Sequence, residues 1–278
     1  MTERTFHKLN HSRVLTRLAV IGCGGTGASL IGGLPFLDQA LRVTGHPGLQ
    51  VVVADGDKVS PTNCVRQPFS ESEIGLYKSV VLVNRLNLFW GLKWKASTEH
   101  VTKRTRGKAD IIISCVDTRA ARREIVSSPL FKECVYWLDV GNNADNGQFV
   151  LGQPKNSRNR KTPYRLPTVA ELFPEIVTPL LDGTSDLPSC SAVEALQRQE
   201  PFINQTLAYH ALAMLGRLFR HGTLTHHGGF VDLANGRMSP LAVNPAVWRR
   251  IMGTTESTKV CPRSRRTAIP GQTNKAAA

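Results

Sequence analysis

The sequence predicts a doubly wound, Rossmann-like α/β fold with a mostly parallel sheet, and three observations lead to this expectation. Short apolar runs typical of buried parallel strands alternate with segments in which apolar residues recur at helical spacing. A glycine-rich turn over residues 22–27, GCGGTG, separates the first expected strand from the first expected helix. Acidic residues, Asp55 and Asp117, end two later strands, at the edge where sheets of this class bind their ligands.

The elements of the first half follow from this alternation of patterns. The first helix is expected to bend near Gly32, Gly33 and Pro35, because glycine and proline weaken a helix interior. The expected order is a strand over 17–22, a helix to about residue 43, a strand over 49–55, a helix over 77–89, a strand over 109–116, a helix over 118–126, and strands over 134–141 and 147–153.

The second half of the chain is less regular. Pro201 is expected to separate two helices, because proline cannot continue a helix. The pair Asn235-Gly236 is a typical hairpin turn. The expected features are a basic loop over 154–165, a long irregular crossover over 171–191, two helices over 191–219, and a hairpin over 228–243.

Composition excludes several classes of protein. The formal net charge of +14 indicates an acidic or phosphate-bearing partner. No two of the six cysteines form a CxxC pair, so a zinc site built from such pairs is not expected. The polar N-terminus lacks the apolar core of a signal peptide, which favours a cytoplasmic protein with free thiols. Residues 18–37 are apolar enough to suggest a membrane span, but their glycines and proline argue against one.

The glycine-rich turn predicts a phosphate-binding loop. Glycines permit a tight turn and allow backbone N–H groups to approach phosphates at a helix N-terminus. The four glycines are Gly22, Gly24, Gly25 and Gly27. Asp55 stands where an acidic residue meets ribose hydroxyls. The alternatives are a turn that serves only helix packing and an Asp55 that caps a turn. NAD-dependent enzymes use the same loop geometry, so the nucleotide is left open.

An ordered set of motifs resembles the ubiquitin-activating superfamily, which includes the bacterial ThiF and MoeB adenylyltransferases. The motifs are G-x-G-G-x-G, D-x-D, N-x2-R-Q, I-G-x2-K and D-x-R-A-A-R, and they cover about residues 17–153. Outside the glycine loop, the matching residues are Asp55, Asp57, Asn63, Arg66, Gln67, Lys78 and Asp117. The segments HSRVLTRLAVIGCGGTG and PSCSAVEALQRQEPFINQ are similar, more narrowly, to the ThiF-family protein of the PRTRC cassette.

The resemblance implies an enzyme that uses ATP to adenylate the C-terminal glycine of a small ubiquitin-like protein. It implies that Arg66 and Lys78 bind phosphates, that Asn63 donates to a phosphate oxygen, and that Asp117 holds Mg²⁺. Asp57 would support the ribose side or orient its loop. It also implies a homodimer and a conjugating-enzyme-like partner. One domain is then expected over residues 1–252, with a nucleotide-binding half (17–153), a second half (154–252), and a disordered basic tail (253–278).

The resemblance further suggests that Cys190 accepts the activated carboxylate as a thioester. Cys190 lies in P-S-C-S just before an expected helix, where a thiol pKa is lowered. An incidental cysteine is the alternative. Cys23, Cys115 and Cys134 are expected to be packing residues, and Cys261 lies in the tail without a predicted scaffold. An arginine acting across the dimer would be Arg4, Arg13 or Arg17.

Several alternatives stay open. The rival enzyme is an NAD-dependent oxidoreductase, and the non-enzymatic rival is a nucleotide-binding scaffold of the same fold. Asp117 could simply cap the helix that follows it. The basic loop and tail could be a solvated surface, a docking site for an acidic protein, or a nucleic-acid site without a recognised binding module. The histidines are expected to be ordinary surface or core residues.

Overall fold

The computed structural model describes residues 7–8, 15–162, 164–182 and 199–253. Cys190, Cys261, Arg4 and Arg13 lie outside this part of the chain, as does almost all of the expected basic tail.

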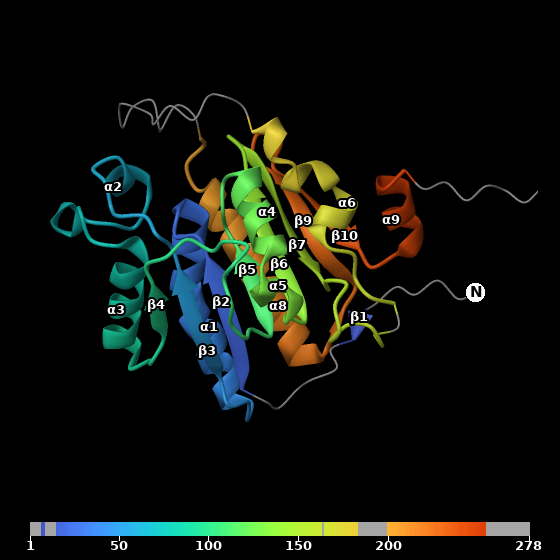
Figure 1. Ribbon diagram of the computed structural model, residues 1–278, viewed down its shortest axis with the longest axis horizontal. Coiled ribbons are helices and arrows are strands. Elements are labelled where there is room, and N and C mark those ends of the chain that lie inside the picture. Colours follow the sequence, from blue (N-terminus) through green and yellow to red (C-terminus); the bar gives the residue numbers. More distant parts are fainter. Residues whose placement is uncertain (1–6, 9–14, 163, 183–198, 254–278) are drawn as a thin grey trace, which may run out of the picture.

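An eight-stranded sheet forms the centre of the molecule (Figure 1), in the order β10-β9-β7-β6-β5-β2-β3-β4. The strands from β4 to β6 run parallel, and β7, β9 and β10 extend the sheet by antiparallel pairing. The predicted fold class is therefore confirmed. The strands are β2 (Thr16–Ile21), β3 (Leu49–Ala54), β4 (Lys95–Ser97), β5 (Ile111–Ser114), β6 (Tyr136–Asn142), β7 (Asn146–Gly152), β9 (His226–Asp232) and β10 (Arg237–Ala242). A separate short pair joins β1 (His7–Lys8) to β8 (Thr223–Leu224).

Helices cover both faces of the sheet. The helices are α1 (Gly25–Val43), α2 (Asn63–Arg66), α3 (Lys78–Trp90), α4 (Arg119–Ser127), α5 (Pro129–Lys132), α6 (Val169–Leu172), α8 (Ile203–His221) and α9 (Pro245–Ile251), with 3-10 turns η1 (Glu71–Glu73), η2 (Pro174–Val177) and η3 (Pro179–Leu181). Apolar residues of α1, α3 and α8 share one hydrophobic core with the strands, and those of α4, α5, α6 and α9 share a second.

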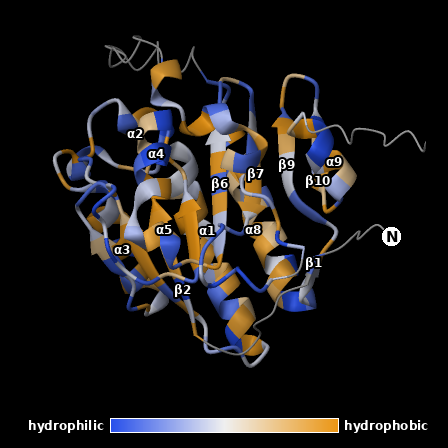
Figure 2. Cartoon of the chain, turned by 45° about the vertical axis from the view of Figure 1, so that its right-hand side comes forward, coloured by the Kyte–Doolittle hydropathy of each residue, from blue (hydrophilic) through white to orange (hydrophobic). Residues whose placement is uncertain are grey.

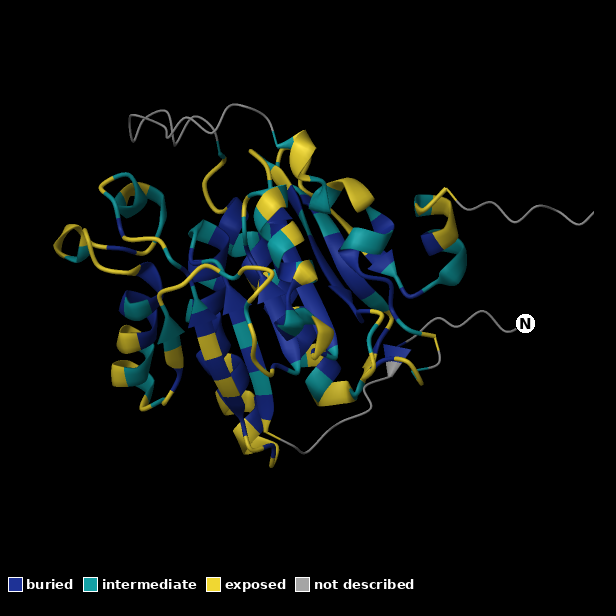
Figure 3. Ribbon diagram, viewed as in Figure 1, coloured by how far each residue is buried: buried dark blue, intermediate teal, exposed yellow. Residues whose placement is uncertain are grey.

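The two cores explain why the central strands are apolar without interruption. Ile111 and Ile113 of β5 belong to the core under α1 and α8, whereas Ile112 belongs to the core under α4. Successive side chains of a strand point to opposite faces, so a strand covered on both sides needs apolar residues at every position. Figure 3 shows the resulting buried centre, and Figure 2 shows apolar residues gathered in the strands.

Most expected elements are confirmed, but several short ones were not predicted. These are strand β4, the β1–β8 pair, the short helices α2, α5, α6 and α9, and the 3-10 turns. The apolar stretch 18–37 folds as most of β2, the glycine loop and the first part of α1, with Pro35 inside the helix. None of the described helices is long and apolar enough to cross a membrane. Helix α8 follows Pro201 as expected, and the hairpin β9–β10 turns at Gly236, whose φ is +59°.

Strand order creates a crevice beside β2. Strand β2 has β3 on one side and β5 on the other. The chain passes from β2 through α1 to β3, continues through α3 to β4, and then returns to β5 across β2. The connections after β2 and β5 therefore leave in opposite directions, which is the switch point where open α/β sheets bind ligands.

The basic loop over 154–165 forms ion pairs with other residues of the chain, although its sequence suggested a solvated surface loop. Arg158 Nη1 lies 2.9 Å from Asp110 Oδ1, and Arg165 Nη2 lies 2.6 Å from Glu171 Oε1. Lys155 also contacts Glu171, at 3.1 Å. Three of its cations thus hold the loop onto its own chain. Arg17 is likewise paired with Asp110, at 3.0 Å, which leaves it poorly suited to act across a dimer.

Buried His227 predicts a loss of stability in mild acid. The side chain is 0% exposed, and burial lowers its pKa from 6.5 to about 4. Between these values the unfolded chain binds a proton that the folded chain does not, so stability falls as pH falls. We expect wild type to lose about 2 kcal/mol from pH 7 to pH 5 through this group, measured by urea unfolding. His227→Gln should flatten this pH dependence and His221→Gln should not; equal slopes in both variants would contradict the assignment.

Candidate active site

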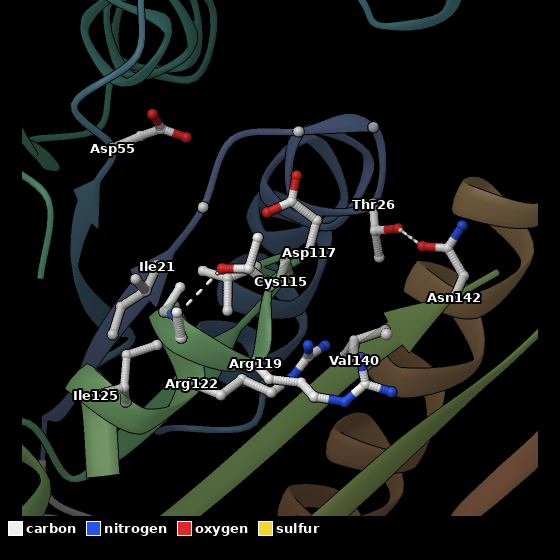
Figure 4. A pocket seen from close by; sticks show the side chains of 18 of the residues that line it. Ile21, Thr26, Asp55, Cys115, Asp117, Arg119, Arg122, Ile125, Val140 and Asn142 are labelled. Atoms are coloured by element: carbon white, nitrogen blue, oxygen red, sulfur yellow. Dashed lines mark hydrogen bonds between the residues drawn. The ribbon is translucent and has the colours of Figure 1, made fainter. Parts of the chain in front are cut away.

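A cavity of about 1020 Å³ opens at the carboxyl edge of the parallel strands. Almost all described residues of the predicted site line it, although they come from five separate segments of the chain. These residues are Gly22, Gly24, Gly25, Asp55, Asp57, Asn63, Arg66, Gln67, Lys78 and Asp117. Figure 4 labels two of them, Asp55 and Asp117. Gly27 does not line the cavity, and Cys190 lies outside the described residues.

The glycines of the loop serve different purposes. Gly22 has φ +97°, and a Cβ there would lie 2.7 Å from the Cys115 carbonyl oxygen. A Cβ on Gly27 would lie 2.0 Å from the Gly22 carbonyl oxygen. Close backbone contacts require glycine at these two positions, and at Gly22 the positive φ does so as well. A Cβ on Gly24 would meet no described atom within 4 Å, and Gly24 lines the cavity, so this position leaves room for a ligand.

Asp55 ties the glycine loop to the second parallel strand. Its carboxylate accepts hydrogen bonds from the backbone N–H of Cys23 and, at 2.7 Å, from that of Asp57. Burial of this side chain, which is 7% exposed, raises its pKa, and the two N–H donors act in the opposite direction. Each carboxylate oxygen has a second lone pair, so Asp55 can still accept from a ligand hydroxyl.

Lys78 brings a buried cation to the cavity. It begins α3, is 7% exposed, and its Nζ lies 3.2 Å from Asp57 Oδ2. Its backbone N–H also donates to the Asp57 carbonyl oxygen, at 3.0 Å. His100 Nε2 lies 3.7 Å from the other Asp57 oxygen. The Asp57 loop is therefore held on the first turn of α3, and both Asp57 and Lys78 line the cavity.

The short helix α2 supplies three further polar groups. Asn63 Oδ1 accepts from the Ser60 backbone N–H at 2.9 Å, which leaves the Asn63 amide N–H groups as donors. Arg66 Nε and Gln67 Oε1 are buried without a hydrogen-bond partner among the described residues. Buried polar atoms are normally paired, so unpaired ones beside a cavity indicate groups that a ligand would satisfy.

Asp117 does not cap α4, and that alternative interpretation is wrong. Thr118 is the N-cap, since its hydroxyl accepts from the Ala121 backbone N–H at 3.1 Å. The next two N–H groups, of Arg119 and Ala120, donate to the Asp182 carboxylate at 3.0 and 2.9 Å. Asp117 is exposed and makes no hydrogen bond to any described side chain, and Figure 4 shows its carboxylate beside the glycine loop.

The cavity is also lined by residues to which the sequence analysis gave no role, among them Arg122, which ends the D-x-R-A-A-R motif. Arg122 of α4 is buried and pairs with fully buried Asp139 on β6, its Nε lying 3.0 Å from Asp139 Oδ1. Other lining residues come from β6, β7 and β9, from η2 and the residue before it, and from the start of α8: Gly141, Asn142, Gln148, Phe173, Glu175, Asn204 and Phe230.

The three buried cysteines among the described residues are not activated nucleophiles. Cys23, Cys115 and Cys134 are buried, and loss of solvation raises the pKa of all three thiols, that of Cys134 to about 12. A thiol with a raised pKa carries little thiolate at neutral pH. This agrees with the expectation that these three are packing residues.

Comparison with solved structures identifies the fold. The crystal structure of PaaA is similar with a TM-score of 0.55 and 16% identity, over 82% of this chain and 64% of PaaA. E. coli MccB with ATP is similar with a TM-score of 0.53 and 16% identity, over 82% of this chain and 64% of MccB. The chain therefore spans slightly less than two thirds of the length of these proteins, and at such identity the likeness concerns the fold alone.

Comparison of the sequence identifies the family. No curated protein matches the chain significantly. The model of the ThiF family matches residues 1–221, which include the glycine loop, every described residue of the predicted site and all of α8. The protein therefore belongs to the ThiF family.

Proposed function

We propose that this protein is an ATP-dependent adenylating enzyme that activates the C-terminal carboxylate of a small protein or peptide. One observation carries the proposal: Arg66, Lys78 and Asp117 line the same cavity as the glycine loop and Asp55. Membership of the ThiF family supports the same activity.

The proposed reaction joins two anions. The substrate carboxylate attacks the α-phosphate of ATP, an acyl-phosphate bond forms, and pyrophosphate leaves. The site must therefore neutralise negative charge on the phosphates, which Arg66 and Lys78 would do and which Asn63 would assist by donating a hydrogen bond. No strong base is needed, because a carboxylate is already ionised at neutral pH.

Asp117 is the residue that would hold Mg²⁺. Among the described residues no group of three or more candidate ligands comes together. Mg²⁺ bound with a nucleotide commonly uses one or two carboxylates and the phosphates themselves, so a single exposed carboxylate beside the glycine loop fits this mode. The ion would supply further positive charge to the phosphates.

We propose a ubiquitin-like protein with a C-terminal glycine as the substrate. E. coli MccB has also been solved with MccA-N7isoASN, in a structure similar to this chain with a TM-score of 0.52 and 16% identity over 82% of this chain and 65% of MccB. A small-protein or peptide substrate is consistent with that pairing. The homodimer, the conjugating-enzyme-like partner, the Cys190 thioester, the PRTRC assignment and the cytoplasmic location rest on the sequence and stay predictions.

The two alternative functions would use the residues of this cavity differently. An NAD-dependent oxidoreductase would use the glycine loop and Asp55 but would leave Arg66, Lys78 and Asp117 without a joint purpose. A non-catalytic scaffold would bind ATP without ever releasing pyrophosphate.

Binding calorimetry tests the proposal. We expect Mg·ATP to bind the wild type, NADH not to bind, and Asp117→Asn to weaken Mg·ATP but not ATP measured in EDTA. Glu124, which lies farther along α4 and also lines the cavity, offers the matched control Glu124→Gln. Binding of NADH in place of Mg·ATP would overturn the proposal. Pyrophosphate release in the presence of candidate small proteins would then separate an enzyme from a scaffold.

A further inference from the structure

Asn204 lies against the glycine loop although the two are far apart in the sequence. It stands in the first turn of α8, is 8% exposed, and its Oδ1 accepts a hydrogen bond from the Thr26 hydroxyl at 2.7 Å. Its amide also covers Gly25, because a Cβ on Gly25 would lie 2.6 Å from Asn204 Nδ2. The same hydroxyl of Thr26 lies 3.1 Å from Asn142 Oδ1, as Figure 4 shows.

The start of α8 is itself held in place by the loop before it. The Glu200 backbone N–H donates to the Ala144 carbonyl oxygen at 2.8 Å, and Gln199 Nε2 donates to the Asn143 carbonyl oxygen at 3.3 Å. Asn204 Nδ2 donates to Gln199 Oε1 at 3.1 Å. Phe202 adopts φ +70°, a strained value for a bulky residue that persists only where the surroundings enforce it.

Packing alone does not account for an asparagine at this position. The neighbouring inward residues of α8 are apolar: Ile203, Leu207, Ala208 and Ala211. A buried amide is costly unless it is hydrogen-bonded, and an apolar side chain would fill the same space without that cost. Asn204 is hydrogen-bonded to Thr26 of the glycine loop, which would bind the phosphates of ATP in the proposed function. An asparagine at this position therefore stabilises the conformation of that loop.

We propose that Asn204 is a positioning residue for ATP, which fixes the glycine loop through Thr26 and Gly25. The proposal rests on the proposed adenylating function and extends it. It makes nucleotide affinity depend on α8 and on residues 199–200, which lie far from the glycine loop in the sequence. Asn204 acts through the loop and need not touch the nucleotide.

A double-mutant cycle on Mg·ATP binding tests the proposal. We expect Asn204→Leu and Thr26→Val each to weaken Mg·ATP by about tenfold, the effect of one lost hydrogen bond in an ordered loop. The double variant should also be about tenfold weaker, and not about a hundredfold, because both changes remove the same contact. Thr26→Ser keeps the hydroxyl and should bind like the wild type.

Asn87 provides the matched control. It is a partly buried asparagine of α3, outside the cavity, whose side chain bonds to the Trp94 backbone at 2.9 and 3.0 Å. Asn87→Leu should lower the melting temperature without changing the Kd for Mg·ATP, which separates general destabilisation from positioning.

The proposal would be overturned if Asn204→Leu folded and bound Mg·ATP with the affinity of the wild type. It would also be overturned if the double variant were about a hundredfold weaker, because the two changes would then act independently. If Asn204→Leu does not fold, Thr26→Val decides, and wild-type affinity in that variant overturns the proposal. A wild type that does not bind Mg·ATP at all would instead overturn the proposed function, and the role of Asn204 with it.

Discussion

Asp139→Ala is expected to lower the free energy of unfolding by about 3–5 kcal/mol, the usual effect of removing one partner from a buried ion pair. Asp139 is 0% exposed on β6, and Arg122 Nε donates to its two oxygens at 3.0 and 3.2 Å. The Ser114 hydroxyl donates to it at 2.6 Å, and Trp137 Nε1 donates to Ser114 at 2.7 Å. Loss of the carboxylate therefore leaves a buried guanidinium and a buried hydroxyl without their acceptor.

Urea unfolding at pH 7 measures this loss. The double variant Arg122→Met/Asp139→Leu should recover much of the stability, because replacing both charges with apolar groups removes the unpaired ion. Glu133→Ala, at an exposed carboxylate, is the control and should change little. A loss below about 1 kcal/mol in Asp139→Ala would show that water reaches Arg122 and that the pair is not truly buried.

Lys78→Met is expected to weaken Mg·ATP binding by about 10- to 100-fold, the effect of losing one charge-assisted hydrogen bond. The Lys78 side chain is 8% exposed, so its charge is poorly screened by solvent, whereas its partner Asp57 is 56% exposed and can be hydrated once the lysine is gone. The change should therefore affect nucleotide affinity much more than stability.

Lys58→Met is the matched control for this measurement. Lys58 follows Asp57 directly, but its Nζ lies 5.1 Å from the centre of the Tyr77 ring and it does not line the cavity. Calorimetric titration of both variants with Mg·ATP compares loss of the cavity cation with loss of a neighbouring one. Equal affinities in Lys78→Met and wild type would show that Lys78 does not contact the phosphates.

The sequence predicted the central sheet well because its signals are local. Uninterrupted apolar runs, such as that of β5, arise wherever a strand is covered on both faces, and the helical periodicity of α3 needs no partner to be recognised. Strand β4 was missed because it has three residues, none of them fully buried. Its pairing with β3, and not an apolar pattern of its own, makes it a strand.

The residues of the candidate site also fall into two groups: those that local sequence patterns indicate and those that only the fold brings together. The residues predicted from motifs lie in the connections that follow β2, β3 and β5, no farther than the first turn of the next long helix, so the parallel sheet brings them to one edge. Three other features depend on contacts between distant segments. Asp182 accepts hydrogen bonds at the start of α4, Arg122 pairs with Asp139, and Asn204 accepts a hydrogen bond from Thr26. No spacing along the chain indicates such contacts.

Short-range patterns of glycine and apolar periodicity were thus sufficient for the α/β class with a mostly parallel sheet, and motifs that resemble a known family indicated most residues of the cavity's polar wall. Only the tertiary structure revealed that Asp182 binds the start of α4, that Arg122 pairs with Asp139, and that Asn204 contacts the glycine loop. The physical reason is that periodicity and turn chemistry act between neighbours in the chain. Burial and hydrogen bonding, in contrast, select partners only after the sheet and its covering helices have brought distant side chains together.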